Sequence, residues 1–440
     1  MGKDNYDPAN LFARQTAYQQ TYQNPLQDRP EQCSIVSTYE GRNVRNGCGL
    51  VSTINLKNLA EKQGFEQIAH DSLNFRQHGL DLVHKHQSVA VVKEAVGVDP
   101  SRAVLAFLKQ AVAKPFETIM GSLPDVSKID LKTYNAAGVE REPRLQTLNS
   151  LLDTEEKSKH LEENHAALNI RSILTVFASY SWFSHDNRGS PVKIVFNYGT
   201  DLLNAMFTGT ALVFGRFKNS PYFGSSLDDN NVAGHEFTHQ VIDNIAQLVY
   251  SRQPGALNEH FADVFGLISD FLRNKLSIEQ AEAEDKLRMG DLFIKDLNNI
   301  KYSLRSFSNP GEALGNGKNA HPLLGEDIQP DNLTYMKDTD EDEGGVHIYS
   351  GALNRAFYLA AKQLGDYNWW GLGAVWFLTL FRLDPNASFD QFKEEIVKSA
   401  EQLFGEGRVK SAIVNAFIVV GLYDNNFSDP SQFMQVPNPR

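Results

Sequence analysis

The chain has 440 residues, of which 41% are apolar and 22% charged, and its formal net charge is −12. These values are ordinary for a globular protein with a large core, and the acidic balance argues against nucleic acid as a partner because phosphate binding needs a basic surface. The most apolar run, 369–381, is shorter than the roughly 20 residues that span a bilayer, so we expect a buried core helix there and no membrane partner.

The first part of the chain, 1–125, differs in composition from the rest and is interpreted as an N-terminal extension. Amphipathic patterns predict helices over 51–72 and 100–120, and Pro115 should end or kink the second of them. The turn-forming residues 121–125 mark the predicted end of the extension.

A sheet-rich lobe is predicted over 126–248 and a mainly helical lobe over 249–440. In the first lobe, the patterns favour a helix over 161–184 and strands over 192–198 and 210–215. We expect these two strands to belong to an antiparallel sheet beside the later helices.

The strongest chemical signal is the motif His235-Glu236-Phe237-Thr238-His239. Residues four apart share one face of a helix, so His235 and His239 direct two imidazoles at one point, as tetrahedral zinc requires. Glu236 lies beside the first ligand and can take a proton from a water on the metal. A chance match to this motif is expected in on the order of one chain in a hundred, so a third ligand is needed.

Glu259 supplies that ligand in the segment Gly255-Ala256-Leu257-Asn258-Glu259, 20 positions after His239. Two imidazoles and one carboxylate leave the fourth zinc position open for water, as in catalytic sites. Asp263, one helical turn later, can accept the other ring N–H of a ligand histidine and fix its tautomer. The alternative for both carboxylates is a solvated helix face.

These motifs resemble those of the thermolysin-like zinc metallopeptidases (neutral metalloproteinases), over roughly residues 128–440. The resemblance implies an α+β, two-lobed zincin fold, with a sheet-rich N-terminal lobe, a mainly helical C-terminal lobe and, here, the N-terminal extension. It also implies hydrolysis of internal peptide bonds. The spacing from His239 to Glu259 is one residue longer than in the related zinc aminopeptidases.

The resemblance assigns further roles. Tyr250 and His347 would donate hydrogen bonds to the tetrahedral intermediate, and Asp342 would orient His347. Arg305 would bind a backbone carbonyl of the substrate, while Asn204 and Ala205 would pair with an extended peptide. The pocket after the scissile bond would be lined by Phe223, Val232, Met289 and Leu304, which implies cleavage before bulky hydrophobic residues.

The family's double calcium site is only partly matched. Asn231, Asp270 and Asp291 suit calcium, but Lys286 and Arg288 stand where the family has acidic ligands. Since Ca²⁺ needs six to eight oxygen ligands, we expect at most one calcium ion, with a basic side chain in place of the missing one.

The extension is interpreted as an inhibitory or chaperone prosegment, which would make the chain a zymogen. Cys33 could block zinc as a thiolate, although an ordinary cysteine is favoured, and the role of Cys48 stays open. His84-Lys85-His86 could form a second metal site, but a solvated turn is favoured.

Two alternatives to an endopeptidase are kept: a catalytically silent binding protein of the same fold, and an aminopeptidase-type zincin. We expect a monomer that binds peptide or protein substrates. The resemblance implies secretion, yet residues 1–30 are polar and contain no recognisable signal peptide, so a cytoplasmic location is kept as an alternative.

Overall fold

The computed structural model describes residues 48–70, 72–73, 100–136, 161–199, 202–215, 220–226 and 228–423. The chain divides into two compact units, 1–43 and 44–440, and all described residues belong to the second. The predictions for Cys33 and for His84-Lys85-His86 lie outside the described residues.

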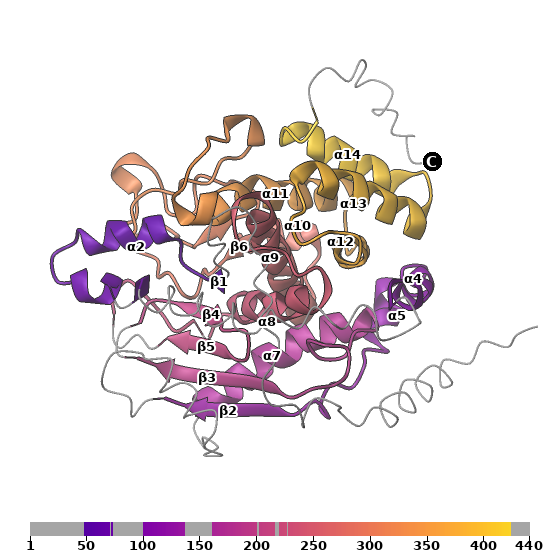
Figure 1. The fold of residues 1–440 in the computed structure, drawn as a ribbon, viewed down its shortest axis with the longest axis horizontal. Helices are drawn as coiled ribbons and strands as arrows, with labels where there is room; N and C mark the ends of the chain where they lie inside the picture. Colours follow the sequence, from indigo (N-terminus) through magenta and orange to yellow (C-terminus); the bar gives the residue numbers. More distant parts are fainter. Residues whose placement is uncertain are drawn as a thin grey trace, which may run out of the picture. The chain divides into compact units, whose positions relative to one another are not determined.

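Five strands form one mixed sheet in the order β1-β4-β5-β3-β2 (Figure 1). Their bounds are Cys48–Gly49 (β1), Leu131–Asn135 (β2), Val192–Tyr198 (β3), Ala205–Phe207 (β4) and Leu212–Gly215 (β5). The strands β1, β4 and β5 pair antiparallel, whereas β5, β3 and β2 pair parallel.

The expectation of an antiparallel sheet is therefore wrong for the two strands on which it rested. β3 and β5 are the predicted strands at 192–198 and 210–215, and they run parallel. The sequence reading missed β4, which lies between them in the chain and forms a hairpin with β5. That extra reversal of direction brings β5 back parallel to β3.

Three helices pack against one another at the centre of the described fold: α7 (Leu161–Ser179), α8 (Asn230–Ile245) and α9 (Arg252–Asn274). The helix α8 packs against β4, α7 and α9. Asp229 caps α8 by accepting from the backbone N–H groups of Asn231 and Val232, which satisfies donors that have no partner within the helix. The motif helix is thereby fixed between the sheet and the helical part.

The remaining helices are α2 (Thr53–Ala60), α4 (Pro100–Ala111), α5 (Phe116–Met120), α10 (Ile278–Ala283), α11 (Asp342–Leu364), α12 (Trp369–Leu380), α13 (Phe389–Phe404) and α14 (Arg408–Val419). Pro115 lies at the start of α5, so the predicted break of the 100–120 helix is confirmed. The helix α12 is buried along almost its whole length, as the apolar run predicted. The mixed α+β fold is confirmed.

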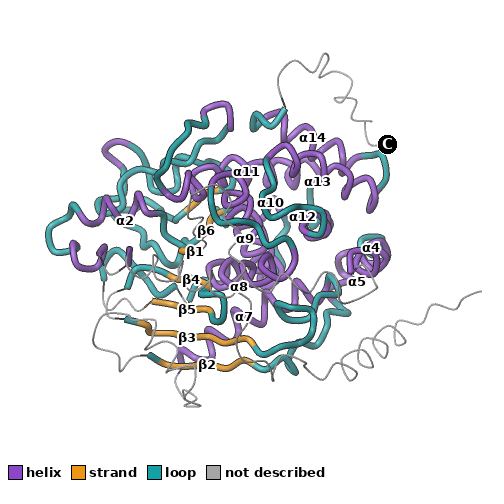
Figure 2. The backbone as a smooth tube through the Cα atoms, in the orientation of Figure 1, coloured by secondary structure: helices purple, strands orange, loops and turns teal. Residues whose placement is uncertain are grey.

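Loops make up most of 290–341, where the regular pieces are β7 (Arg305–Ser306), η1 (Gly317–Asn319) and η2 (Leu333–Tyr335) (Figure 2). The strand β7 pairs antiparallel with β6 (Arg288–Met289). Across the part of the chain that the structure describes, no helix combines the length and apolarity needed to cross a bilayer.

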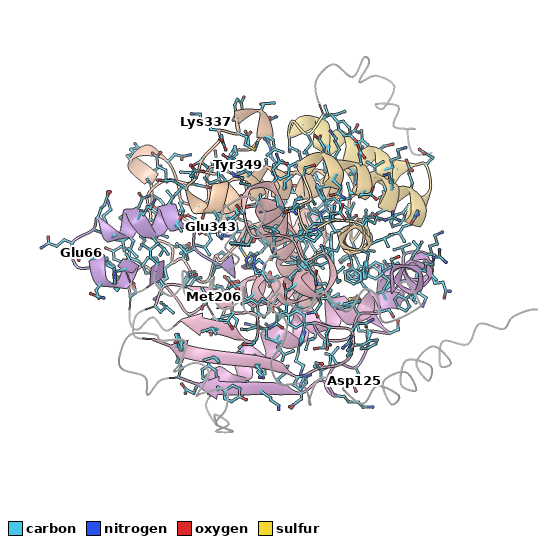
Figure 3. All side chains as sticks on the ribbon, viewed as in Figure 1. Glu66, Asp125, Met206, Lys337, Glu343 and Tyr349 are labelled. Atoms are coloured by element: carbon cyan, nitrogen blue, oxygen red, sulfur yellow. The ribbon has the colours of Figure 1, made fainter. Side chains whose placement is uncertain are left out.

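The start of α11 is kinked at Glu343, Gly344 and Gly345, which have φ values of 52°, 86° and 84°. A Cβ on Gly345 would lie 2.4 Å from the ring of Tyr349, so a side chain is excluded there by space as well as by backbone conformation. The hydroxyl of Tyr349 donates to the carbonyl of Lys337, which ties the kink to the preceding loop (Figure 3). The kink precedes His347 directly and so determines its position.

Candidate metal centre and active site

The helices α8 and α9 bring His235, His239 and Glu259 together in the interior. The two Nε2 atoms lie 3.0 Å apart, and they lie 3.5 and 3.6 Å from the carboxylate oxygens of Glu259. Two ligand atoms at about 2.1 Å from a tetrahedral ion lie about 3.4 Å apart, so the spacing fits zinc. Among the described residues, these three are the group whose ligand atoms could hold a metal ion.

The other ring nitrogens of the two histidines face oxygen acceptors. His235 Nδ1 lies 2.8 Å from an Asp263 oxygen, and His239 Nδ1 lies 2.8 Å from the amide oxygen of Asn258. Such acceptors hold the ring N–H on Nδ1 and leave both Nε2 lone pairs directed at the centre. Asp263 was predicted as an acceptor from the sequence. Asn258 was not predicted, although Asn258 lies next to Glu259 in the chain.

The electrostatics favour the ligating forms of these groups. Burial, and then the neighbouring His235, lower the pKa of His239 to about 3. Burial alone would raise the pKa of Glu259, but His347 and the motif histidines together hold it below its usual value. A neutral imidazole and an ionised carboxylate are the forms that bind a metal ion.

Glu236 lies on α8 next to the first histidine and is completely buried. Among the described residues, neither of its carboxylate oxygens has a hydrogen-bond partner of normal geometry. Burial, and then the charge of Glu259, raise the pKa of Glu236 well above its usual value. A buried carboxylate of raised pKa can serve as a proton acceptor and donor.

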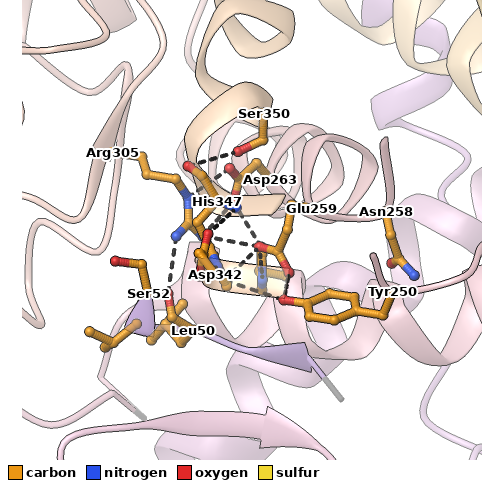
Figure 4. A network of polar contacts seen from close by, with 12 residues as sticks. Leu50, Ser52, Tyr250, Asn258, Glu259, Asp263, Arg305, Asp342, His347 and Ser350 are labelled. Carbon is orange, nitrogen blue, oxygen red and sulfur yellow. Dashed lines mark hydrogen bonds and ion pairs between the residues drawn. The ribbon is translucent and has the colours of Figure 1, made fainter. Parts of the chain in front are cut away.

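Tyr250 and His347 approach the same point from two other segments. The hydroxyl of Tyr250 donates to Glu259 over 2.5 Å and lies 3.3 Å from His347 Nε2 (Figure 4). Asp342 accepts from His347 twice, through Nδ1 at 3.0 Å and through the backbone N–H at 2.8 Å. The carboxylate therefore fixes the ring with Nε2 toward the centre.

Arg305 is buried and forms a bidentate ion pair with Asp263, with both N···O distances 2.7 Å. Asp263 also accepts from Asn354 at 2.7 Å. Although burial favours the neutral acid, Arg305 and His235 keep the pKa of Asp263 well below its usual value. One carboxylate thus joins a metal-site histidine to the guanidinium.

Asn354 was not expected from the sequence. It lies on α11 and links Asp263 to His260, whose Nδ1 is 2.8 Å from the Asn354 amide oxygen. Trp376 donates to the other ring nitrogen of His260 over 2.8 Å. The spacing of Asn354, seven residues after His347 and hence on the same helix face, is the signal that could have indicated it.

The residues expected to bind substrate are occupied by the chain itself. Leu50 donates to the carbonyl of Ala205 over 3.0 Å, and its own carbonyl accepts from Arg305 Nη1 over 3.0 Å (Figure 4). The next backbone N–H, of Val51, donates to the Asn204 side chain over 3.3 Å. The expected pocket residues are all buried in the main apolar cluster, which also contains Leu50: Phe223, Val232, Met289 and Leu304.

The expected calcium region contains a cluster of acids with one ammonium group. Lys286 Nζ lies 3.2 Å from Asp291, while the side chain of Asn231 is bonded to backbone groups of Arg288 and Gly290. Burial, and then Asp291, raise the pKa of Asp270 to about 6. Arg288 pairs with Asp285 at 2.9 Å, so of the two basic residues it is Lys286 that pairs with a residue expected to bind calcium.

Asp229 belongs to the same acidic cluster and was not predicted from the sequence. It is the N-cap of α8 and also accepts from the backbone N–H of Leu292. Burial, and then Asp291, raise the pKa of Asp229 to about 7. Its place just before the motif helix is a capping signal that the sequence carries.

Two family models match the chain in succession: the catalytic domain of thermolysin metallopeptidase over residues 121–243 and its alpha-helical domain over residues 246–422. An extracellular metalloprotease of Pectobacterium carotovorum subsp. carotovorum is 38% identical over 225 residues, which are 50% of this chain and 61% of that protein. Protease PrtS of a Photorhabdus strain is 34% identical over 245 residues, 54% of this chain and 62% of that protein. The chain thus matches less than two thirds of the length of these relatives.

A solved structure, the precursor of protealysin, a metalloproteinase from Serratia proteamaculans, superposes with a TM-score of 0.64 at 26% identity. The match covers 86% of this chain and 100% of that one. Together with the two consecutive family models, this likeness leads to one conclusion: the chain belongs to the thermolysin metallopeptidase family.

Proposed function

We propose that the protein is a zinc-dependent endopeptidase in which His235, His239 and Glu259 bind the metal. One observation carries the proposal: the three ligand atoms have the spacing of a tetrahedral ion's ligands, and the completely buried Glu236 lies next to the first of them on α8. Membership of a metallopeptidase family supports zinc as the ion and peptides as substrates.

The catalytic roles follow from the positions around the centre. Zinc, when bound, lowers the pKa of a water toward about 7 and polarises a carbonyl. Glu236 accepts the proton of the attacking water and delivers it to the leaving nitrogen. Tyr250 and His347 donate to the carbonyl oxygen as it gains negative charge, each contributing about 3 kcal/mol to the transition state. Asp342 keeps the ring of His347 in the orientation that this requires.

The substrate is proposed to be an extended peptide. Ala205 and Asn204 pair with its backbone, and Arg305, held rigid by Asp263, binds one of its carbonyls. The apolar residues Val232 and Leu304 favour a bulky hydrophobic residue after the scissile bond.

The proposed organisation is an N-terminal prosegment over 1–125, a sheet-rich lobe over 126–248 and a helical lobe over 249–440. The likeness to a metalloproteinase precursor supports the prosegment, and the extracellular relative supports secretion. At most one calcium ion is proposed near Asp270 and Asp291, because Lys286 already supplies a positive charge there.

The test compares the purified protein with Glu236→Gln and with a matched control, Glu394→Gln, which changes an exposed glutamate on α13. Zinc content is measured by mass spectrometry, and activity with a peptide blocked at both ends that contains an internal leucine. We expect one zinc per chain in all three proteins and loss of cleavage in Glu236→Gln alone. Zinc binding without cleavage in the parent, both before and after limited proteolysis of the N-terminal extension, would favour a silent binding protein. Cleavage of free N-termini alone would favour an aminopeptidase.

A further inference from the structure

His260 is a polar residue in an apolar part of the interior. It lies on α9 directly after the proposed zinc ligand Glu259 and is completely buried. Its ring packs against the rings of Phe261, Trp376 and Phe392, with centroid distances of 5.7, 6.2 and 5.7 Å. A leucine would suit these surroundings, whereas an imidazole must find a partner for each ring nitrogen. The histidine therefore indicates a role other than packing.

The hydrogen bonds of His260 have a fixed direction. The indole N–H of Trp376 can only donate, so the Nε2 atom of His260, 2.8 Å away, accepts with its lone pair. The proton of the neutral imidazole then lies on Nδ1, which donates to the amide oxygen of Asn354 over 2.8 Å. Trp376 thus fixes the tautomer of His260.

The same direction continues into the metal centre. The Asn354 amide, whose oxygen is held by His260, donates through its NH₂ group to Oδ2 of Asp263 over 2.7 Å. A reversed amide would set its oxygen against the carboxylate and its NH₂ group against the ring N–H. His260 and Asp263 therefore select the same orientation of Asn354 from opposite ends.

The Asp263 carboxylate depends on this donor to be fully satisfied. Oδ1 lies 2.7 Å from Arg305 Nη2 and 2.8 Å from His235 Nδ1. Oδ2 accepts from Arg305 and from Asn354, each over 2.7 Å. Two donors on each oxygen occupy all four lone-pair positions and fix the plane of the carboxylate. Without the Asn354 donor, Oδ2 would keep one partner and the plane could turn away from His235.

We propose that His260 is a positioning residue for the zinc ligand His235. It acts through two intermediates: the Asn354 amide, whose orientation it fixes, and the Asp263 carboxylate, which that amide holds in place. The carboxylate in turn keeps the ring N–H of His235 on Nδ1 and directs Nε2 at the metal. All hydrogen bonds from Trp376 onward point toward the carboxylate, so each strengthens the next. This role rests on the proposed function, because it concerns the zinc site.

The test replaces His260 in two ways and measures zinc affinity by competition with a chelating dye. Leucine removes both ring nitrogens, whereas the amide of glutamine can donate to Asn354 and accept from Trp376, as the imidazole does. We expect His260→Leu to weaken zinc binding by about tenfold, the lower end of the effect of a ligand's own hydrogen-bond partner, because it acts one residue further away. His260→Gln should bind zinc within about twofold of the parent.

A matched control removes a buried imidazole elsewhere. His321 is also buried, and its Nδ1 accepts from the backbone N–H groups of Leu323 and Leu324. His321→Leu is the same substitution with a similar loss of hydrogen bonds, so it should affect stability but leave zinc affinity unchanged. Urea unfolding of the metal-free variants confirms that each is folded under the conditions of the zinc measurement.

A double-mutant cycle tests the route through Asn354. Asn354→Ala should itself weaken zinc binding by about tenfold, because Asp263 loses the same donor. If His260 acts through this amide, His260→Leu should cause no further loss of zinc affinity in the Asn354→Ala background.

The outcomes separate the positioning role from the proposed function. The role is wrong if His260→Leu binds zinc as tightly as the parent, if His260→Gln binds it as weakly as His260→Leu, or if His321→Leu loses as much affinity. Additive losses in the cycle with Asn354→Ala also overturn it. Each of these results leaves the zinc endopeptidase intact, whereas a folded parent that binds no zinc in the dye assay contradicts the proposed function itself.

Discussion

Neutralising two carboxylates on one helix should have opposite effects on stability. Asp263 and Asp270 both lie on α9, seven residues apart, and Asp→Asn changes each by charge with almost no change in shape. Asp263 accepts from the Arg305 guanidinium, whereas Asp270 faces the acidic Asp291, which disfavours its charge. The comparison therefore isolates the electrostatic surroundings of each position.

For Asp263→Asn, the buried guanidinium of Arg305 loses its counter-charge. Removing one partner of a buried ion pair typically costs about 3–5 kcal/mol, and we expect the lower end because the amide oxygen can still accept one hydrogen bond. His235 also loses its charged acceptor, which should weaken zinc binding by about 10–100-fold. Both losses should appear in the same variant.

For Asp270→Asn, we expect the opposite change: the substitution should raise the stability. A folded-state pKa raised from 3.8 to about 6 means that the ionised carboxylate is disfavoured in the folded state. This penalty is absent below the unfolded-state pKa and is complete above the folded-state pKa. At pH 8 its removal should add up to about 3 kcal/mol, and at pH 4, just above the unfolded-state pKa, the difference should shrink to about 0.6 kcal/mol.

The assay is urea unfolding of the metal-free proteins at pH 8 and pH 4, followed by tryptophan fluorescence, with zinc affinity measured separately by competition with a chelating dye. With a slope of about 3 kcal/mol per molar urea, the midpoint should fall by on the order of 1 M for Asp263→Asn and rise for Asp270→Asn at pH 8. If both midpoints moved in the same direction at pH 8, this account of the two surroundings would be wrong.

Three further predictions concern the same regions. His347→Ala should lower kcat by about 10²–10³-fold with little change in KM, as judged by steady-state kinetics on a blocked peptide. Lys286→Met should make thermal stability depend on added calcium, because Asp291 loses its ammonium partner, and an unchanged melting temperature with and without calcium would count against this. The pKa of Asp229 is raised to about 7, so metal-free protein should lose stability as pH rises from 5 to 8. The variant Asp229→Asn keeps the helix cap and should reduce that loss, as measured by urea titrations.

Sequence reading worked best where the signal is local. The histidines of the motif share a helix, so a spacing of four residues by itself predicts that His235 and His239 face one point. Glu259 lies on a second helix, so its position beside the histidines was predicted from the family resemblance as much as from the spacing. The strand at 192–198 and the buried helix at 369–381 were recognisable from side-chain pattern alone.

Non-local relationships were not predictable in this way. The direction of β5 relative to β3 depends on the three-residue strand β4, which is too short to show a pattern. Asn258 and Asn354 are ordinary polar residues in the sequence, and their link to the metal centre depends on how α8, α9 and α11 pack. The hydrogen bond from Arg305 to the carbonyl of Leu50 joins residues 255 positions apart.

Residue types and their spacing define the chemistry that is available: two imidazoles and a base on one helix, a carboxylate on the next, and a basic residue among the acidic residues where calcium was expected. Short-range periodicity suffices for that, because a helix converts sequence spacing into direction. Which groups meet is established by the packing of the folded chain: Asp263 contacts both His235 and Arg305, and the chain's own residues 48–53 lie on the groups proposed to bind substrate. The reason is physical: buried polar groups need partners, and the packing of distant elements determines which partners are within reach.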